Sequence, residues 1–373
     1  MYANIVAYKT GFVKYFFYTY QRWVSGGNVE KRTTIYDIAR ELGISTATVN
    51  RALNGKPRVK EETRAQVLET AEKLGFKPNL LARSLARRRL RIAVVAFTSF
   101  PEFHSRFIEG TREAGRELRD FNVEVDYFSY NDGASDTPEA ERFLNDTLEH
   151  IVSSGYDGAL VLARQHEVLR RFAERGVYLA AAVNDVEPDL RRFYVSYNGL
   201  IAGRIAAELI YRLIPDRTKP IAVASAWAGI GIHKLIDQGF HEQLEIMPLN
   251  LFRICYNIDN ADVAYASTCQ LLDDCPDLGA IYVNSFNSSG VLRAVRERGL
   301  AGKILMITSD ISDELRACIQ SGVVTATIFQ NQYEQGKRGL HMLYQALANN
   351  EPVHGNIMID PQIVMRSNLD LFI

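Results

Sequence analysis

Four side chains near the beginning of the chain have the types and spacing of a group that reads base edges in DNA. They lie between Thr46 and Asn54, a stretch whose apolar residues recur at helical spacing. An arginine can donate two parallel hydrogen bonds to guanine, and a small neighbour can make a short polar or methyl contact. The pattern predicts a helix that enters a major groove. Its outward residues are Thr46, Ala47, Asn50 and Arg51.

Two short helices joined by a tight turn would position these side chains. Thr33 and Thr34 are good residues for beginning a first helix, and Gly43 supplies the left-handed residue of the turn. Ser45 is expected to cap the second helix, and Asn54-Gly55 to end it. We therefore predict a helix-turn-helix, with a small helical hairpin inside a larger domain as the alternative. The predicted inward residues are Ile35, Ile38, Ala39, Leu42, Val49, Ala52 and Leu53.

The charge of this region differs from that of the rest of the chain. Residues 31–91 hold 15 Lys and Arg against 6 Asp and Glu, whereas the whole chain holds 43 against 44. The remainder therefore has 28 against 38, so a basic part is joined to an acidic one. A basic part of this kind favours phosphate binding, since a solvated charged helix more often mixes its signs.

A short leucine-bearing segment, residues 79–86, follows the basic region. Leu81 and Leu85 are four residues apart and would form one apolar stripe on a helix, with Arg83 and Arg87–Arg89 around it. So short a helix cannot form a core by itself. We expect it to need a second copy of the chain and DNA for stability, and the alternative is an ordinary linker.

The first 30 residues are dense in aromatic side chains but are interrupted by Lys14, Gln21 and Arg22, and they lack a signal-peptide pattern. One hypothesis is a misassigned start, with translation beginning at Val29, so that residues 1–28 are not made. The alternative is a real N-terminal arm.

From Arg91 onward, predicted strands and helices alternate over a length that suggests two parallel sheets. Such sheets bind ligands beyond the carboxyl ends of their strands. The four cysteines show no Cys-x-x-Cys pair or neighbouring His cluster, so we expect reduced thiols and no metal site. No apolar run reaches the ~18–20 residues that span a bilayer. We expect a cytoplasmic protein that does not bind a membrane.

Taken together, these motifs resemble the lac repressor family of transcription regulators, from about Thr33 to the C-terminus. The resemblance is most specific in TIYDIARELGISTATVNRALNG, in residues 59–78 and in NLLARSLA. It implies a homodimer that binds a near-palindromic double-stranded DNA operator, with a hinge helix whose Leu85 wedges into the minor groove. It also implies a body of the periplasmic sugar-binding fold, used as a sensor of a small-molecule effector.

The resemblance assigns the DNA contacts residue by residue. Base reading falls to Thr46, Ala47 and Arg51, and the hinge positions are Asn79, Ala82 and Leu85. The positions that usually contact phosphates are Tyr36, Ser45, Thr48, Asn54 and Thr63.

The resemblance also assigns effector contacts at strand ends. Asn284, Asp310 and Gln330 follow the predicted strands Ala280–Val283, Lys303–Ile307 and Val324–Phe329. A carboxylate and two amides suit the vicinal hydroxyls of a sugar, because the carboxylate accepts two O–H donors and the amides serve either role. Asp310 alternatively caps the following helix. The further expected contacts are Asn184 and Asp185, with Phe103 and Arg106 in the loop after the first strand, and Arg164.

One position departs from the family pattern. Ile236 stands three residues before Gly239-Phe240, where the family often has an arginine that holds effector oxygens. The effector is therefore expected to differ from a simple hexose, or to be held by Arg106 or Arg164 instead.

We predict four segments: an extension (1–30), a helix-turn-helix head (31–78), a hinge and linker (79–90) and an effector-binding body (91–373). Within the body, an N-terminal subdomain comprises residues 91–196 and 330–355, and a C-terminal subdomain comprises 197–329. The predicted function is DNA binding modulated by a small polar effector, a sugar or sugar derivative, without a cofactor. The alternative is a sugar receptor or an enzyme with a head of another role. The sequence has no nucleophile elbow, Walker loop or Gly-x-Gly-x-x-Gly that would favour an enzyme.

Overall fold

The computed structural model describes residues 33–53, 57–76, 88–97, 101–130, 138–162, 169–226, 231–286, 288–349, 353 and 355–372. The chain forms two compact units, Met1–Leu80 and Leu81–Ile373. No helix in the described ranges is long and apolar enough to cross a membrane.

The head is a three-helix unit made of α2 (Ile35–Leu42), α3 (Thr46–Leu53) and α4 (Glu61–Lys73). At the start of α2 the Thr34 backbone N–H donates to Asp37 Oδ2 at 2.8 Å, and Gly43 ends the helix at φ 63°. The fully or almost fully buried residues are Ile38, Ala39, Val49, Ala52, Val67 and Ala71. These include four of the predicted inward residues, and Ile35, Leu42 and Leu53 pack half-buried around them. The predicted helix-turn-helix core is confirmed.

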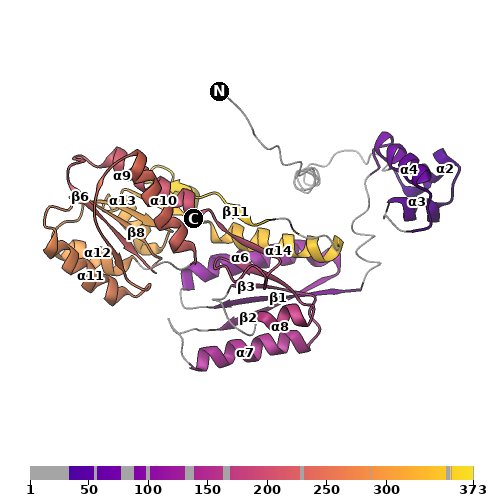
Figure 1. The fold of residues 1–373 in the computed structure, drawn as a ribbon, viewed down its shortest axis with the longest axis horizontal. Coiled ribbons are helices and arrows are strands. Elements are labelled where there is room, and N and C mark those ends of the chain that lie inside the picture. The colour runs from indigo at the N-terminus through magenta and orange to yellow at the C-terminus, as the bar shows by residue number, and fades with distance from the viewer. Residues whose placement is uncertain are drawn as a thin grey trace. The chain divides into compact units, whose positions relative to one another are not determined.

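The first sheet of the body has the strand order β11-β5-β4-β3-β1-β2 and is parallel throughout. Helices cover both of its faces, with α6 and α14 on one side and α7 and α8 on the other (Figure 1). Its strands are β1 (Leu90–Phe97), β2 (Val123–Tyr130), β3 (Gly158–Leu162), β4 (Tyr178–Ala182), β5 (Phe193–Tyr197) and β11 (Ile357–Ile359). Its helices are α6 (Pro101–Leu118), α7 (Pro138–Ser153), α8 (Leu169–Glu174) and α14 (Gln332–Asn349).

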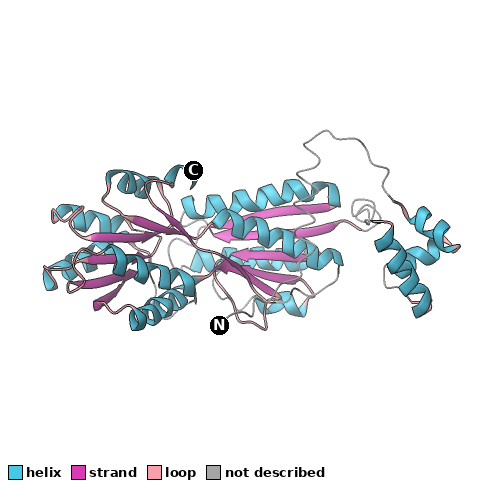
Figure 2. Cartoon of the chain, turned by 90° about the horizontal axis from the view of Figure 1, so that it is seen from above, coloured by secondary structure: helices cyan, strands magenta, loops and turns pink. Residues whose placement is uncertain are grey.

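The second sheet has the order β12-β10-β9-β8-β6-β7, and only β12 runs antiparallel to its neighbour. Ile221 and Val223 join one core cluster while Ala222 and Ala224 join the other, so both faces are buried, as in other parallel sheets (Figure 2). Its strands are β6 (Pro220–Ser225), β7 (Asn250–Tyr256), β8 (Ala280–Asn284), β9 (Leu305–Ser309), β10 (Ala326–Phe329) and β12 (Gln362–Val364). Its helices are α9 (Gly199–Leu213), α10 (Gly231–Ile246), α11 (Ala261–Asp274), α12 (Ser289–Glu297) and α13 (Asp313–Ser321).

The chain passes between the two sheets three times, from β5 to α9, from β10 to α14 and from β11 to β12. The Asn198 backbone N–H donates to the Ile359 carbonyl at 2.9 Å and ties the first passage to the third. Sequence analysis missed β11 and β12, because three-residue strands are too short to show a hydrophobic period.

Among the described residues, three pairs of helices approach each other through glycines: α9 with α10, α6 with α14, and α11 with α12, where a Cβ at Gly290 would lie 2.0 Å from the Ala261 carbonyl. A Cβ at Gly203 of α9 would lie 2.0 Å from the Ile236 carbonyl of α10, and one at Gly239 would lie 2.0 Å from the Leu200 carbonyl. In the other subdomain, a Cβ at Gly110 of α6 would lie 2.0 Å from the Tyr333 carbonyl of α14. Only glycine allows backbones to come this close.

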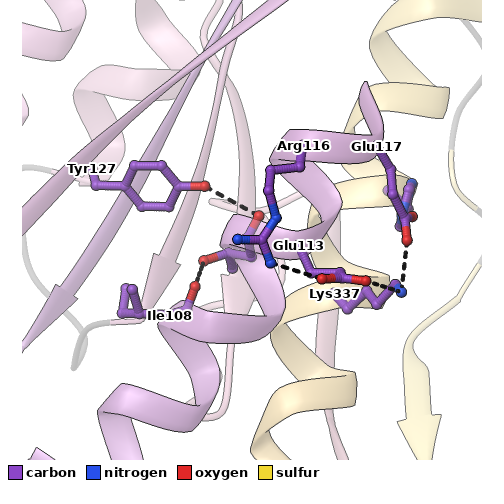
Figure 3. Close-up of polar contacts among 8 residues, drawn as sticks. Ile108, Glu113, Arg116, Glu117, Tyr127 and Lys337 are labelled. Carbon is purple, nitrogen blue, oxygen red and sulfur yellow. Dashed lines mark hydrogen bonds and ion pairs between the residues drawn. The ribbon is translucent and has the colours of Figure 1, made fainter. Parts of the chain in front are cut away.

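Charged side chains run along the contact between α6 and α14 (Figure 3). Lys337 Nζ lies 2.8 Å from Glu117 Oε1 and 3.6 Å from Glu113 Oε1, and Arg116 donates to Glu113 at 2.8 Å. Tyr127 of β2 donates to the Thr111 carbonyl at 3.1 Å, which fixes α6 on the sheet. These contacts hold α6 in register with α14 while the glycines set the distance.

The prediction that Phe103 and Arg106 lie in a loop is wrong. Both lie on α6, which begins at Pro101, six residues before the predicted start at Phe107. Proline at the first helical position has a suitable φ and lacks an N–H that would go unsatisfied there, so the helix begins at Pro101.

We expect Gly203→Ala to destabilise the body by about 2 kcal/mol, since the added methyl group would collide with the α10 backbone. In an uncrowded helix the same change would stabilise by roughly 0.5–1 kcal/mol. Chemical denaturation of the full chain measures the difference. The matched control is Gly115→Ala in α6, where the nearest atom would be the movable Tyr127 hydroxyl at 3.0 Å. Equal effects of the two substitutions would contradict the close-approach argument.

Candidate DNA-binding and effector-binding sites

The outward face of α3 carries the predicted base-reading side chains. Ala47 and Arg51 are exposed and Thr46 is half-buried, while Val49 and Ala52 of the same helix are buried. The exposed arginine is therefore presented to solvent by a helix whose opposite face is fixed in the core. This geometry suits insertion into a major groove.

Hydrogen bonds around α3 keep it in place. Ser45 Oγ accepts from the Thr48 backbone N–H at 3.1 Å, which confirms the predicted cap. Arg64 of α4 donates to the Ala52 carbonyl at 3.1 Å near the other end of α3. Of the other predicted phosphate contacts, Tyr36 is 66% exposed on α2 and Thr63 is half-buried on α4. Thus α3 is held at both ends.

Five predicted contacts lie outside the described residues. They are Asn54, Asn79, Ala82, Leu85 and Arg164.

In the body, Asp310 is the best-defined of the predicted effector contacts. It follows β9 and is 1% exposed. One carboxylate oxygen accepts from the Gln330 side-chain amide at 2.7 Å, and the other accepts from Gln332 Nε2 at 2.7 Å and from the Gln330 backbone N–H at 3.3 Å. Gln330 lies in the passage from β10 to α14, and Gln332 is the first residue of α14. Asp310 therefore connects the second sheet to the segment that leads back to the first.

The backbone of Asp310 is in the left-handed region, at φ 66°. Its N–H donates to the Ile328 carbonyl at 3.0 Å, and its own carbonyl accepts from Thr327 Oγ1 at 2.6 Å. These bonds to β10 hold a conformation that costs a non-glycine residue free energy, and such residues gather at functional sites. The capping alternative for Asp310 is wrong, because Ser312 caps α13 by accepting from the Leu315 N–H at 3.2 Å.

Burial raises the pKa of Asp310 to about 7, against the opposing effect of the N–H donors from Gln332 and Gln330. A neighbouring carboxylate, Asp259, raises this pKa further. The carboxyl group therefore changes its charge near neutral pH. Hydroxyl donors from a ligand would favour the ionised form.

Asn284, the last residue of β8, is 1% exposed and belongs to a polar cluster at the neighbouring strand ends. Its amide donates to Ser225 Oγ at 3.2 Å and to Asp237 Oδ1 at 3.3 Å. His233, one turn before Asp237 on α10, also hydrogen-bonds Asn284, and burial lowers the pKa of its imidazole. The amide hydrogens of Asn284 are thus engaged inside the protein.

The structure brings Asp310 and Gln330 into contact but leaves the other predicted residues in separate groups. Asn184 and Asp185 follow β4, and Asp185 pairs with Arg191, whose Nη2 lies 2.7 Å from Asp185 Oδ2. Phe103 is 8% exposed and packs edge-on against Phe286 beyond β8, with ring centroids 5.5 Å apart. This ring contact joins α6 of one subdomain to the other subdomain. Arg106 is exposed on α6.

Sequence analysis missed Gln332, His233 and Asp237. A signal existed for the last two, because positions four apart share one face of a predicted helix. Ile236 is fully buried between them and packs against Gly199 of α9, so the position where an arginine was expected points into the core. Gln332 was missed because the predicted start of its helix lay two residues later.

Comparison with known proteins gives two family matches. A model of the lacI family of bacterial regulatory proteins matches residues 34–79, and a model of the periplasmic binding protein domain matches residues 92–351. Catabolite control protein A of Priestia megaterium is 26% identical over 339 residues, which cover 87% of this chain and 95% of that protein. The protein of the same name from Streptococcus mutans is 50% identical over 62 residues, 17% of this chain and 19% of that protein.

Solved structures resemble the body in fold. A periplasmic ribose ABC transporter protein from Conexibacter woesei superposes with a TM-score of 0.68 at 19% identity, over 76% of this chain and 95% of that one. A solute binding protein from Agrobacterium vitis, solved with α-D-tagatopyranose, gives 0.66 at 18% identity over 75% and 96%. With its helix-turn-helix head and its periplasmic-binding-protein body, the chain belongs to the lacI family of bacterial regulatory proteins.

Proposed function

We propose that this DNA-binding regulator acts in the cytoplasm as a homodimer on a near-palindromic operator. Two copies of α3, each presenting Arg51, would read two half-sites, since the symmetry of such an operator mirrors that of a dimer. A small polar effector, a sugar or sugar derivative, would bind between the two body subdomains and change operator affinity. Solute binding proteins of the same fold have been solved with α-D-tagatopyranose and with D-allose, which supports this effector class.

The observation that carries the proposal is the buried carboxylate of Asp310 and its two glutamine partners. A buried carboxylate is costly unless it is satisfied, and here its donors come from the passage between the subdomains. Ligand hydroxyls could replace the glutamine amides at the same oxygens.

The mechanism then follows from linkage between two sites. If effector hydroxyls replace the glutamine amides as hydrogen-bond donors to Asp310, the side chains of Gln330 and Gln332 are released. The passage into α14 can then adopt another arrangement. A change in the angle between the subdomains would alter the spacing of the two heads and hence operator affinity. The effector shifts this equilibrium only by its difference in affinity for the two arrangements.

We expect Arg51→Ala to weaken binding to an operator selected from a random duplex library by roughly 1–3 kcal/mol, because a bidentate contact to guanine is lost. Binding to unselected duplex should change little. Fluorescence anisotropy at one salt concentration measures both. Arg40→Ala, which removes the same charge from α2, is the control and should affect both DNAs alike. Equal losses on both DNAs for Arg51→Ala would show that Arg51 contacts only phosphate.

Asp310→Ala should abolish the response to effector, because neither the glutamine amides nor effector hydroxyls then have a carboxylate to bind. The head is unchanged, so the variant should still bind operator, with one affinity that effector does not alter. A thermal-shift screen of sugars and sugar derivatives supplies the effector, and DNA binding with and without it gives the response. An effector that stabilises both proteins equally would refute this role. A chain that binds the sugar but no operator would instead support the receptor alternative.

Effector affinity should rise with pH up to about 7 and level off above it, because an effector that donates hydroxyls binds the ionised Asp310. The stability of the folded chain depends on pH in the opposite direction. A raised pKa adds stability below about pH 4, the ordinary range of an aspartate, and this stability is lost as pH rises to about 7. Asp310→Asn should remove the pH dependence of both effector affinity and folding stability. In this variant one glutamine amide can turn over and keep its hydrogen bond to residue 310. Calorimetry in buffers of different ionisation enthalpy measures the proton release. Equal pH profiles for the two proteins would contradict the assignment.

A further inference from the structure

The strand ends of the second sheet present a row of carboxyl groups. Asp310 follows β9, Asp237 of α10 lies against the ends of β6 and β8, and Asp259 follows β7. Burial is the main cause of the raised pKa values of Asp310 and Tyr282. Asp259 raises the pKa of Asp310 further, and Asp237 and Asp310 both raise that of Tyr282. We call this row the acidic wall. Its three residues all belong to the subdomain of the second sheet, so they lie on one side of the proposed effector site.

The acidic wall has little positive charge beside it. Neither Asp237 nor Asp310 forms an ion pair with a lysine or arginine among the described residues. His233 lies near Asp237 and Asp259, but burial lowers its pKa and keeps it neutral at pH 7. The arginine that the family pattern places here is replaced by Ile236, which is buried against α9.

In the described part of the opposite subdomain, Arg191 and Glu102 do not balance this charge. The charge of Arg191 is neutralised by Asp185, and Glu102 at the start of α6 has its pKa raised by burial and by Asp313 and Glu314 of α13. Glu102 is thus a further acidic side chain and supplies no positive charge. Arg106, exposed on α6, is the one unneutralised cation among the predicted effector contacts that the structure describes.

One buried nitrogen beside the wall has a hydrogen bond to offer to a neutral polar ligand. His233 Nδ1 is buried and has no hydrogen-bond partner among the described residues. Buried polar atoms are almost always hydrogen-bonded, so this one calls for a ligand or a water molecule. A neutral imidazole can donate to or accept from a hydroxyl, which matches the acceptors on either side of it.

We propose that the acidic wall of Asp237, Asp259 and Asp310 rejects effectors that carry a phosphate or carboxylate, and admits uncharged or amine-bearing polyols. The inference rests on the proposed function, because it assigns specificity to the same site. Its physical basis is exclusion by like charge, which is greatest above about pH 7, where Asp310 is ionised. An anion placed here would face three acceptors in a poorly solvated region, whereas a hydroxyl donates to them.

The test compares neutral sugars with their anionic derivatives, with the full chain as the protein. The pairs are glucose with glucuronate and glucose 6-phosphate, galactose with galacturonate, and mannose with mannose 6-phosphate. Thermal shift followed by calorimetry at low salt should show the uncharged member of a responding pair binding at least about tenfold more tightly than its anion. Glucosamine should bind at least as well as glucose if glucose responds.

A substitution in the acidic wall then tests whether the wall causes the preference for the uncharged sugar. Asp237→Asn keeps an acceptor for Asn284 and should reduce the preference for the uncharged sugar severalfold. The matched control, Asp277→Asn, removes an exposed charge that lies before β8, at the opposite end of the sheet, and should leave the preference unchanged.

The two possible failures are distinguishable. Anions that bind as well as their uncharged partners, or an unaltered preference in Asp237→Asn, would overturn the inference and leave the sugar effector standing. If no sugar of any charge binds, the proposed effector class itself fails, and the inference fails with it.

Discussion

The structure of the body depends on how one buried carboxyl group is satisfied. Asp310 stands at the end of β9 in a left-handed conformation, and its oxygens take their hydrogen bonds from the segment that leads out of the second sheet. Burying such a group without partners would cost several kcal/mol. The glutamines that remove this cost are also the residues where the chain leaves one subdomain and enters α14 of the other. The proposed effector contact and the connection between the subdomains therefore share the same few atoms.

In the rest of the body, the helices are packed so closely that few other segments would need to move. In each subdomain a pair of helices is held at close range by glycines, α6 with α14 and α9 with α10. Backbones packed this closely behave as rigid units, because close-packed interiors resist deformation. The ion pairs of Lys337 with Glu113 and Glu117 also fix the register of α6 against α14. A change that begins at Gln332, the first residue of α14, would therefore be passed on through α6 as a whole.

The head is organised differently, because DNA binding requires side chains that are exposed to solvent. Six small and aliphatic residues form its core, and this is enough to hold α3 with Arg51 facing outward. The basic charge of residues 31–91 favours binding to any phosphate backbone, while in the proposed function sequence selectivity comes from the few side chains on α3. Affinity and selectivity are thus assigned to different residues of one small unit.

Local pattern in the sequence was enough to predict the helix-turn-helix and the strand–helix alternation, because hydrophobic period, Gly43 and the Ser45 cap act within a few residues of each other. The resemblance also placed Asp310 and Gln330 at strand ends, and the structure joins them. Contacts that depend on distant segments were decided only by the tertiary structure. Ile236 faces the core because Gly199 and Gly203 bring α9 so close, and this turns Asp237 toward Asn284, 47 residues away. The pairing of Gln332 with Asp310 and the three-residue strands β11 and β12 likewise follow from how the two sheets are connected, which no local periodicity encodes.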